Sequence, residues 1–405
     1  MITVDEALRA VLERTPVLSV EAIPLEEAPG RILRGRVVSD RDQPPFNRAA
    51  MDGFAVRTVD TAAPGARLRI TGEVRAGVWP DRTVGAGEAF RIMTGAPVPE
   101  GADAVIQVER TKAEGASDIV IEISVAAGQN IVPKGSEAAR EAMLLDEGVR
   151  IGPAQLAVMA SVGVVDPVVG RRPRVAVIVT GDEVVEPKAT PSAAQIRNAN
   201  GPALVAAICE AGGIASAFGV VPDDPAKTRA AIARALDEGH DAIVLSGGVS
   251  AGDFDFVERA LGELGIALHV TSVRVKPGAP FVFGTRGDTL IFGLPGNPVS
   301  AQVTFELFAR PALLRMQGAK AFLRPRLEAA LAGSLINRSN RRNYLPVVVG
   351  ARDGRLHALP VRTQGSGDTL AHATANALAI LEPDQTAAAA GDRVFIHPLS
   401  SFLEV

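Results

Sequence analysis

Short apolar runs alternate with helical patterns through the second half of the chain. Residues 175–179 and 242–245 are apolar throughout, as expected of buried strands, whereas residues 225–238 and 255–264 repeat apolar positions at helical spacing. The alternation continues between residues 174 and 316. Strands and helices repeated in this way predict a doubly wound α/β domain, with a parallel sheet and right-handed crossovers.

The rest of the chain has a different pattern. From residue 49 to residue 149, short apolar runs are separated by Gly and Pro, which predicts an antiparallel or mixed β domain. Helical patterns at residues 4–14 and 153–162 flank this stretch, which indicates an insertion between two parts of a helical domain. The tail from residue 322 is strand-like and punctuated by Gly, which predicts a small separate β domain.

The motif Leu294-Pro-Gly-Asn-Pro298 lies between an apolar run at 289–293 and an amphipathic pattern at 299–316. This order predicts a buried strand, a tight turn and a helix in direct succession. Asn297 stands where it can cap the helix, and Pro298 suits the first helical turn, where a missing N–H costs nothing. Free backbone N–H groups and the positive helix end favour a phosphate or another oxyanion.

Other polar, Gly-rich loops follow strands of the predicted sheet. They are Thr180-Gly-Asp-Glu183, Val221-Pro-Asp-Asp224 and residues 246–255. Because ligands collect outside the carboxyl ends of parallel strands, these loops and the 294–298 motif are expected to form one site. Glycines let a ligand approach the backbone, and the serines add short donors. The carboxylates that could hold a hydrated Mg²⁺ against a phosphate are Asp182, Glu183, Asp223, Asp224, Asp253 and Asp255.

Each loop also has a simpler interpretation. Asp and Gly after a strand are ordinary turn and helix-cap residues, and Asp224-Pro225 in particular looks like an N-cap. Lys276, beside Pro and Gly, is equally compatible with a phosphate contact and with a solvated strand end. Asp52-Gly53 is a common hairpin signal, so the polar segments at 47–54 and 91–97 are interpreted as turns. The convergence of several loops on one sheet edge favours a functional site.

Composition narrows the function. At 405 residues the chain should hold more than one domain, and 47% hydrophobic with 22% charged residues indicates a folded soluble protein. Aromatic residues make up 4% and the formal net charge is −4, which argues against a nucleic-acid-binding surface. The single cysteine, Cys209, excludes an internal disulfide framework, and the five histidines show no metal-ligand spacing. No signal peptide and no apolar run long enough for a bilayer stand out, so the cytoplasm is expected.

Taken together, these segments resemble the molybdopterin molybdenumtransferase family, of the MoeA and gephyrin E-domain type. The matching motifs run in family order along the chain: Ala50-Met-Asp-Gly-Phe-Ala55, Ile92-Met-Thr-Gly-Ala-Pro97 with Gly101-Ala-Asp-Ala-Val105, Val179-Thr-Gly-Asp-Glu183, Ser246-Gly-Gly-Val-Ser250, Lys276-Pro-Gly278, Leu294-Pro-Gly-Asn-Pro298, and Gly365-Ser-Gly367 with Ala375-Asn376. The resemblance implies a homodimer with a multidomain subunit. Its domains would be an elongated helical part for dimerisation (1–45 plus 140–172), an inserted β-rich domain (46–139), a molybdopterin-binding α/β domain (173–322) and a carboxyl-terminal β-barrel (323–405).

The resemblance also implies the reaction. Adenylylated molybdopterin and molybdate give molybdenum cofactor and AMP, with a divalent cation, usually Mg²⁺. In this family the active site lies between the α/β domain of one subunit and the β-rich domain of the other. The dithiolene sulfurs of the substrate bind molybdenum, so a chain without a Cys/His cluster is compatible with this chemistry. The implied partners are a molybdopterin adenylyltransferase and molybdoenzyme-maturation proteins, and neither nucleic acid nor a membrane is expected.

The cation-binding groups of the family correspond to acidic residues of this chain. By resemblance, Glu183, Asp224 and Asp255 position the cation and the adenylyl phosphate. Glu137 is a further expected metal ligand, in the stretch Pro133-Lys-Gly-Ser-Glu-Ala138. Relatives tend to have Arg-x-x-Gly-Glu-Asp-Ile there, so Glu137 puts a longer carboxylate where an Asp is expected.

The remaining roles follow from the same resemblance. Lys276 would neutralise phosphate charge, and Asp52 and Thr94 would complete the site across the dimer. The residues expected to hold the molybdopterin substrate are Thr180, Gly181, Asp182, Ser246, Gly247, Gly248, Ser250, Pro295, Gly296, Asn297, Ser300 and Ser366.

Two departures from the family pattern, Glu137 where an Asp is expected and Ala279, keep alternatives open. Many members read Lys-Pro-Gly-Lys-Pro where this chain has Ala279, so one anion-binding charge is missing. A molybdopterin-binding paralogue or scaffold with weak or no transferase activity is therefore a second hypothesis. A third is the molybdopterin adenylyltransferase, whose sheet domain is similar. It would need neither the β-rich insertion nor the barrel, so the chain length favours the molybdenum-inserting transferase.

Overall fold

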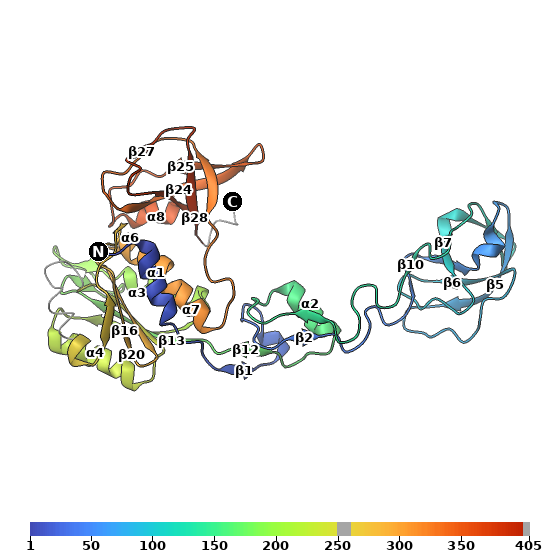
Figure 1. Ribbon diagram of the computed structural model, residues 1–405, viewed down its shortest axis with the longest axis horizontal. Coiled ribbons are helices and arrows are strands. Elements are labelled where there is room, and N and C mark those ends of the chain that lie inside the picture. The colour runs from blue at the N-terminus through green and yellow to red at the C-terminus, as the bar shows by residue number, and fades with distance from the viewer. Residues whose placement is uncertain (249–260, 400–405) are drawn as a thin grey trace. The chain divides into compact units, whose positions relative to one another are not determined.

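The computed structural model describes residues 1–248 and 261–399, which pack as two units. The first comprises Met1–Gly35, Glu147–Gly152 and Asp166–Val405, and the second comprises Arg36–Asp146 and Pro153–Val165. Each unit has its own sheets and its own apolar core (Figure 1).

A six-stranded sheet forms the centre of the first unit. Its strand order is β16 (Ile214–Val221), β13 (Arg174–Thr180), β17 (Ala242–Ser246), β21 (Thr289–Leu294), β20 (Val282–Arg286) and β18 (Ala267–Val270). The first four strands are parallel, as predicted. The prediction of a parallel sheet is wrong for β20 and β18, which are antiparallel to their neighbours. Only Gly287 and Asp288 join β20 to β21, and so short a turn can connect only antiparallel strands.

Alternate residues of β13 face opposite helical layers. Val175 and Val177 lie in a core with residues of α1 (Val4–Glu13), α3 (Asn200–Glu210), α6 (Pro298–Thr304), η4 (Phe305–Ala309) and α7 (Arg310–Met316). Ala176 and Ile178 lie in a second core with residues of α4 (Pro225–Asp237). The strand is buried on both faces, which explains its unbroken apolar run and confirms the doubly wound α/β fold.

Helix α1 packs with the α/β domain. Thr3 and Glu6 form a capping box at its start, with the Thr3 hydroxyl accepting from the Glu6 N–H at 3.2 Å. Val4, Ala7 and Val11 then present one buried stripe to the core that also holds β13. Helix α1 therefore belongs to the α/β core rather than to the elongated helical part expected for residues 1–45.

The carboxyl-terminal β domain is a closed barrel, as expected from the family resemblance. Its ring runs β24 (Arg342–Arg352), β25 (Arg355–Pro360), β22 (Leu327–Leu331), β28 (Arg393–Pro398) and β26 (Ala377–Leu381), and the pairing of β26 with β24 closes it. The short strand β19 (Val275–Lys276), which comes before the barrel strands in the sequence, also pairs with β24.

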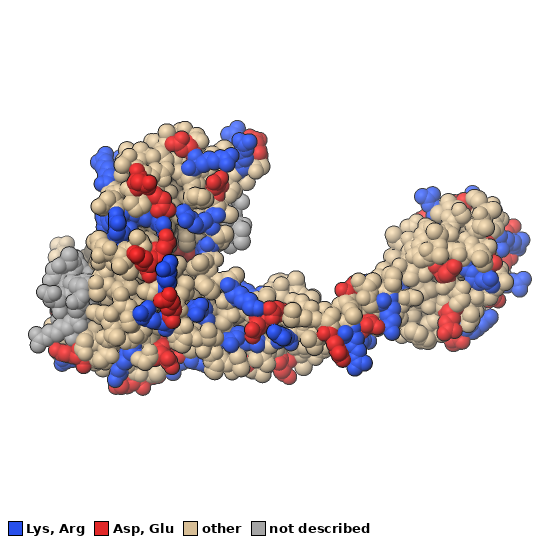
Figure 2. Space-filling view, viewed as in Figure 1, with Lys and Arg blue, Asp and Glu red and all other residues tan. Residues whose placement is uncertain are grey.

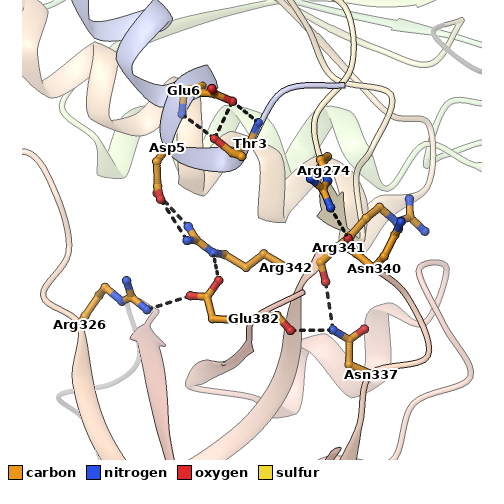
Figure 3. A network of polar contacts seen from close by, with 10 residues as sticks. All are labelled: Thr3, Asp5, Glu6, Arg274, Arg326, Asn337, Asn340, Arg341, Arg342 and Glu382. Atoms are coloured by element: carbon orange, nitrogen blue, oxygen red, sulfur yellow. Dashed lines mark hydrogen bonds and ion pairs between the residues drawn. The ribbon is translucent and has the colours of Figure 1, made fainter. Parts of the chain in front are cut away.

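An ion-pair network joins the barrel to α1 (Figure 3). Arg342 donates to both carboxylate oxygens of Asp5, at 2.8 and 3.0 Å, and to Glu382 at 2.8 Å. Glu382 also accepts from Arg326 at 3.2 Å. Burial acts to lower the pKa of Arg342, but its hydrogen bonds to Asp5 and Glu382 outweigh burial and leave that pKa raised.

The second unit contains a mixed sheet in the order β7 (Ala104–Gln107), β4 (Gly53–Val56), β6 (Glu88–Ile92), β5 (Arg67–Val74), β9 (Asp118–Ile121) and β8 (Thr111–Glu114). Only the β5–β6 pair is parallel among these strands. This agrees with the predicted antiparallel or mixed β-rich domain. The unit also holds β2 (Val37–Val38) paired with β11 (Met143–Leu145), β3 (Arg48–Ala49) paired with β10 (Ile131–Val132), and α2 (Pro153–Ser161).

The remaining elements are short. They are β1 (Val20–Ala22) with β12 (Val168–Gly170), β14 (Val184–Val185) with β15 (Ile196–Arg197), β23 (Leu335–Ile336) with β27 (Ala387–Ala388), α8 (Thr369–Thr374), and the single turns η1 (Leu25–Glu27), η2 (Thr58–Thr61) and η3 (Val108–Arg110).

Acidic and basic side chains are mixed over the face drawn in Figure 2, without a large region of one sign. None of the helices in residues 1–248 and 261–399 is long and apolar enough to cross a membrane.

Candidate functional site

A pocket of about 370 Å³ opens at the carboxyl ends of the parallel strands in the first unit. The loops after β13, β17 and β21 line it, together with the segment that leads into α3. The predicted residues that it brings together are Thr180, Gly181, Glu183, Ser246, Gly247, Gly248, Pro295, Gly296 and Asn297. This agrees with the expectation that the strand-end loops converge.

Gly247 shows why the loop after β17 is rich in glycine. Its φ of 98° lies in the left-handed region, and a Cβ built there would come within 2.4 Å of the Thr180 carbonyl oxygen. Only glycine therefore lets the loop after β17 approach the loop after β13 so closely.

Asn200 ties the loops together, although the sequence reasoning did not single it out. It is 8% exposed, and its Nδ2 donates to Ser246 Oγ at 2.8 Å and to the Gly296 carbonyl at 2.7 Å. Ser246 Oγ in turn donates to the Pro295 carbonyl at 3.3 Å. The signal available in the sequence was the polar run Arg197-Asn-Ala-Asn200 just ahead of a helix.

Two buried oxygens of this pocket are unpaired. Thr180 Oγ1 and Asn200 Oδ1 have no hydrogen-bond partner among the described residues. Buried polar atoms are nearly always partnered by protein, ordered water or a ligand, so we expect water or a ligand at these two oxygens. Carboxylates of Glu183 and Asp223 also line the pocket. Oxygen donors of this kind are the ones that Mg²⁺ prefers, so the residues present fit a hydrated magnesium ion.

The loop after β16 supplies a different carboxylate from the one expected. Asp224 caps α4, with its Oδ1 accepting from the Lys227 N–H at 2.9 Å, and it does not line the pocket. An Asp directly before a helix-starting Pro favours this use. Asp223 lines the pocket instead, and its N–H donates to Asp182 at 3.1 Å. Asp182 therefore orients Asp223 and is not itself part of the lining.

The 294–298 motif forms the predicted turn between a strand and a helix, but not the predicted side-chain cap. Asn297 occupies the N-cap position of α6, but its side chain makes no capping bond and lines the pocket. Ser300 is 4% exposed and lies outside the lining, so its side chain is not presented to a pocket ligand. Ser366 reaches this loop through its backbone, since its carbonyl accepts from the Val299 N–H at 3.0 Å.

Lys276 lies outside the lining of this pocket. It is half-buried in β19, opposite Asn343 of the barrel strand β24. Ala279, where the family resemblance leads us to expect Lys, is 7% exposed, and Pro280 beside it lines the pocket.

In the second unit, Asp52 and Thr94 are in direct contact. Asp52 Oδ1 accepts from the Thr94 N–H at 2.6 Å and from the Thr94 hydroxyl at 2.7 Å. The hydrogen bonds from the Thr94 side chain and backbone hold the pKa of Asp52 below its ordinary value of 3.8. Both residues are exposed, so an ionised, preoriented carboxylate faces solvent there.

The expected metal ligands do not form a ready-made cluster. Glu137 pairs with Arg48 at 2.7 Å in the second unit. Residues 1–248 and 261–399 contain no group of at least three His, Cys, Asp or Glu side chains placed to hold a metal ion. Ser250 and Asp255 lie outside the described residues, so their predicted roles stay predictions.

Comparison with known sequences covers almost the whole chain. The profile described as MoeA N-terminal region (domain I and II) matches residues 2–163. The probable molybdopterin binding domain matches residues 176–315, and the MoeA C-terminal region (domain IV) matches residues 328–399.

Relatives from distant bacteria agree with these matches. A molybdopterin molybdenumtransferase of Bacillus subtilis is 33% identical over 94% of this chain and 90% of its own length. One from Haemophilus influenzae is 32% identical over the full length of both chains, at 100% of each. Molybdopterin molybdenumtransferase 2 of Mycobacterium tuberculosis is 33% identical over 99% of this chain and 100% of its own.

Solved structures show the same fold. The crystal structure of a molybdopterin biosynthesis MoeA protein from Pyrococcus horikoshii is 33% identical with a TM-score of 0.80, covering 98% of this chain and 99% of that chain. A second MoeA structure from the same organism has a TM-score of 0.84 at 28% identity, covering 98% and 100%. The family resemblance seen in the motifs is confirmed, and the chain belongs to the molybdopterin molybdenumtransferase (MoeA) family.

Proposed function

We propose that this chain inserts molybdenum from molybdate into adenylylated molybdopterin and releases AMP, in molybdenum cofactor biosynthesis. The observation that carries the proposal is the pocket at the carboxyl ends of β13, β17 and β21, with its unpaired Thr180 and Asn200 oxygens. It lies in the segment matched by the probable molybdopterin binding domain. The names of the relatives support the same reaction.

The residues of the pocket divide the work of holding the substrate. The close-packed glycine loops around Gly247 and Gly296 leave backbone groups open to the phosphates. Glu183 and Asp223 would hold Mg²⁺, which when bound neutralises charge on the phosphoanhydride. The gain in rate comes from positioning and from electrostatic stabilisation as that bond breaks. Molybdate is a substrate in this scheme, and the dithiolene sulfurs of molybdopterin receive its metal.

Asp52 and Thr94 would act on the substrate from a second subunit. The family resemblance implies a homodimer in which the β-rich domain of one subunit meets the α/β domain of the other. The exposed, ionised Asp52 suits a group that completes a site on another chain. Sedimentation analysis of the purified protein tests this: a dimer is expected, and a monomer at working concentrations would contradict it. Asp255 keeps its proposed role at the phosphates, and a cytoplasmic location fits the proposed chemistry. Lys276, outside the pocket lining, is not assigned a phosphate contact.

The direct test is AMP release. Purified protein is incubated with adenylylated molybdopterin, molybdate and Mg²⁺, and AMP is followed by chromatography. We expect turnover that requires both molybdate and Mg²⁺ and that falls at least 100-fold in Glu183→Gln. Asp288→Asn is the matched control, since Asp288 is an exposed carboxylate in the β20–β21 turn, far along the strands from the pocket. No AMP release by a preparation that binds the substrate would contradict the proposal.

A second candidate is a protein that binds molybdopterin without turnover. The observation in its favour is Ala279, a buried methyl group at a position where the family resemblance leads us to expect a Lys charge. Ala279→Lys separates the two candidates. If the chain is a binding protein that lost a catalytic charge, the variant should gain AMP release that the original chain lacks. If the chain is already a transferase, the variant changes the rate but does not create it.

A further inference from the structure

Trp79, the one tryptophan of the chain, is 70% exposed. It lies in the loop that follows β5, and its ring meets the Phe46 ring edge-on, with centroids 5.6 Å apart and an interplanar angle of 85°. This contact orients the indole while most of it stays open to solvent. Val78 beside it is 54% exposed, and Met51 is 43% exposed. Grouped exposed apolar side chains of this kind indicate a surface that binds something.

Strand register places the start of the Trp79 loop at the same sheet edge as Asp52 and Thr94. In the parallel pair β5–β6, Val74 lies opposite Ile92, so the loop of Trp79 and the turn of Thr94 leave the same edge of the sheet. In the antiparallel pair β4–β6, Gly53 also lies opposite Ile92, which puts Asp52 at that edge.

The strand ends that lead to the two residues are close together. Strand β6 lies between β4 and β5, so the start of β4 and the end of β5 are two strand spacings, or about 10 Å, apart. The Met93 N–H donates to the Val74 carbonyl at 3.2 Å and holds the two exits together. The segments that carry Trp79 and Asp52 therefore leave the same edge of the sheet, with Trp79 five residues beyond the end of β5.

The hydrogen-bonding state of Asp52 selects the kind of ring. Its Oδ1 already accepts two bonds from Thr94, and no described group donates to its Oδ2. A carboxylate with an open oxygen favours a ligand edge that carries N–H donors. The aminopyrimidinone ring of a pterin presents an adjacent N–H and amino group on one edge. Adenine presents its amino group between acceptor nitrogens, which an ionised carboxylate disfavours.

We propose that Trp79 and Asp52 bind the pterin ring of the substrate, with the ring stacked on the indole and its N–H edge on the carboxylate. This rests on the proposed function, in which the α/β pocket takes the phosphate end of the same molecule. Trp79 then acts in substrate binding, and Asp52 sets the preference for a pterin over adenine.

The single tryptophan gives a direct optical test with the full-length protein. Free pterin is the probe, and AMP is the comparison ligand. Pterin stacked on Trp79 should quench the indole emission and itself emit when the indole is excited, whereas AMP should leave the emission unchanged. Asp52→Asn should weaken pterin binding about tenfold in the same titration. Equal quenching by AMP and pterin, or no quenching by pterin, would overturn the proposal.

Steady-state AMP release provides the second readout. Trp79→Ala should raise KM for adenylylated molybdopterin about tenfold with kcat within about twofold, because stacking is lost. Trp79→Phe keeps an aromatic face and should recover most of that loss. Val59→Ala, at an exposed valine of η2 in the same unit, is the control and should leave KM unchanged. An unchanged KM in Trp79→Ala would overturn the proposal.

The two proposals fail in different ways. If the protein releases no AMP but free pterin quenches Trp79, the transferase function fails and the pterin site stands. If AMP is released and neither the emission nor KM responds to pterin or to Trp79→Ala, the pterin site fails and the transferase function stands.

Discussion

The α/β pocket and the Asp52–Thr94 edge of the second unit hold their polar groups in opposite ways. In the pocket, Asn200 is buried and its bonds to Ser246 and Gly296 join separate loops. At the edge, Asp52 and Thr94 are exposed and bond to each other. A pocket of this kind is formed by the fold itself, so its residues carry stability and binding together. An exposed pair can be altered with little effect on the fold, so its loss should appear in catalysis alone.

The largest expected effect comes from replacing a glycine of the pocket, which should lower both stability and activity. Gly247→Ala places a methyl group 2.4 Å from the Thr180 carbonyl at a left-handed φ, so unfolding should become easier by about 2–4 kcal/mol and AMP release should be lost. Gly287→Ala is the control, with φ 56° and no atom within 4 Å of the added Cβ, and should cost about 1 kcal/mol. Urea denaturation measures both. Equal losses would show that the pocket glycine has no special packing role.

Asp52→Asn should have the next largest effect, and on activity only. Removing the charge should lower kcat/KM about 100-fold, of which about tenfold is the weaker binding of the pterin ring, because a preoriented carboxylate is lost from the site. The melting temperature should stay within about 2 °C, because Asp52 is exposed. Thermal melting and AMP release on the same preparation test this. A large drop in melting temperature would mean that the edge is part of the fold in the way the pocket is.

Asn200→Ala should combine smaller losses of both kinds. It removes the donor of two buried hydrogen bonds, so unfolding should become easier by about 1–3 kcal/mol. KM for adenylylated molybdopterin should also rise, because the Ser246 and Gly296 loops are no longer tied together. Asn340→Ala, at an exposed asparagine, is the control. A change in KM without any change in stability would contradict the description of the pocket as part of the fold.

The smallest effect is a shift in titration. Thr94→Val removes the side-chain hydrogen bond that contributes most to lowering the pKa of Asp52, so that pKa should rise toward 3.8. Because the folded-state pKa is the lowered one, the bond stabilises the fold above about pH 4 and is lost as the pH falls through the folded pKa. The free energy of unfolding of the variant should therefore be lower than that of the original chain near neutral pH, and the two values should converge in strong acid. Carboxyl NMR titration of Asp52 gives the measurement, and an unchanged pKa would contradict it.

Local patterns were enough to predict the architecture. Apolar period and glycine placement gave the doubly wound domain, the β-rich insertion and the strand-end loops that line the pocket. The antiparallel pairing of β20 with β18 and β21 escaped, because the two-residue turn at Gly287 and Asp288 was not recognised as a hairpin signal. The packing of α1 also escaped, since its buried stripe fits any apolar face.

The site residues could be predicted only where their roles depend on neighbours in the sequence. In Asp223-Asp224-Pro225 either carboxylate could have faced the pocket, and the Asp before Pro is the one used by the helix. Asn200 was not singled out because its partners lie 46 and 96 residues away in the sequence. The contact of Asp52 with Thr94, 42 residues apart, was likewise expected only from the family resemblance.

The central claim is that the pocket of one subunit and the Asp52–Thr94 edge of another form one active site. Mixing the inactive variants Asp52→Asn and Glu183→Gln, after dissociation and reassociation, tests it most directly. If the site is shared, each mixed dimer has one site with both changes and one with neither. Random pairing should then restore about one quarter of the original AMP release. If both groups act within one subunit, every site keeps one change, and the absence of any recovery would contradict the claim.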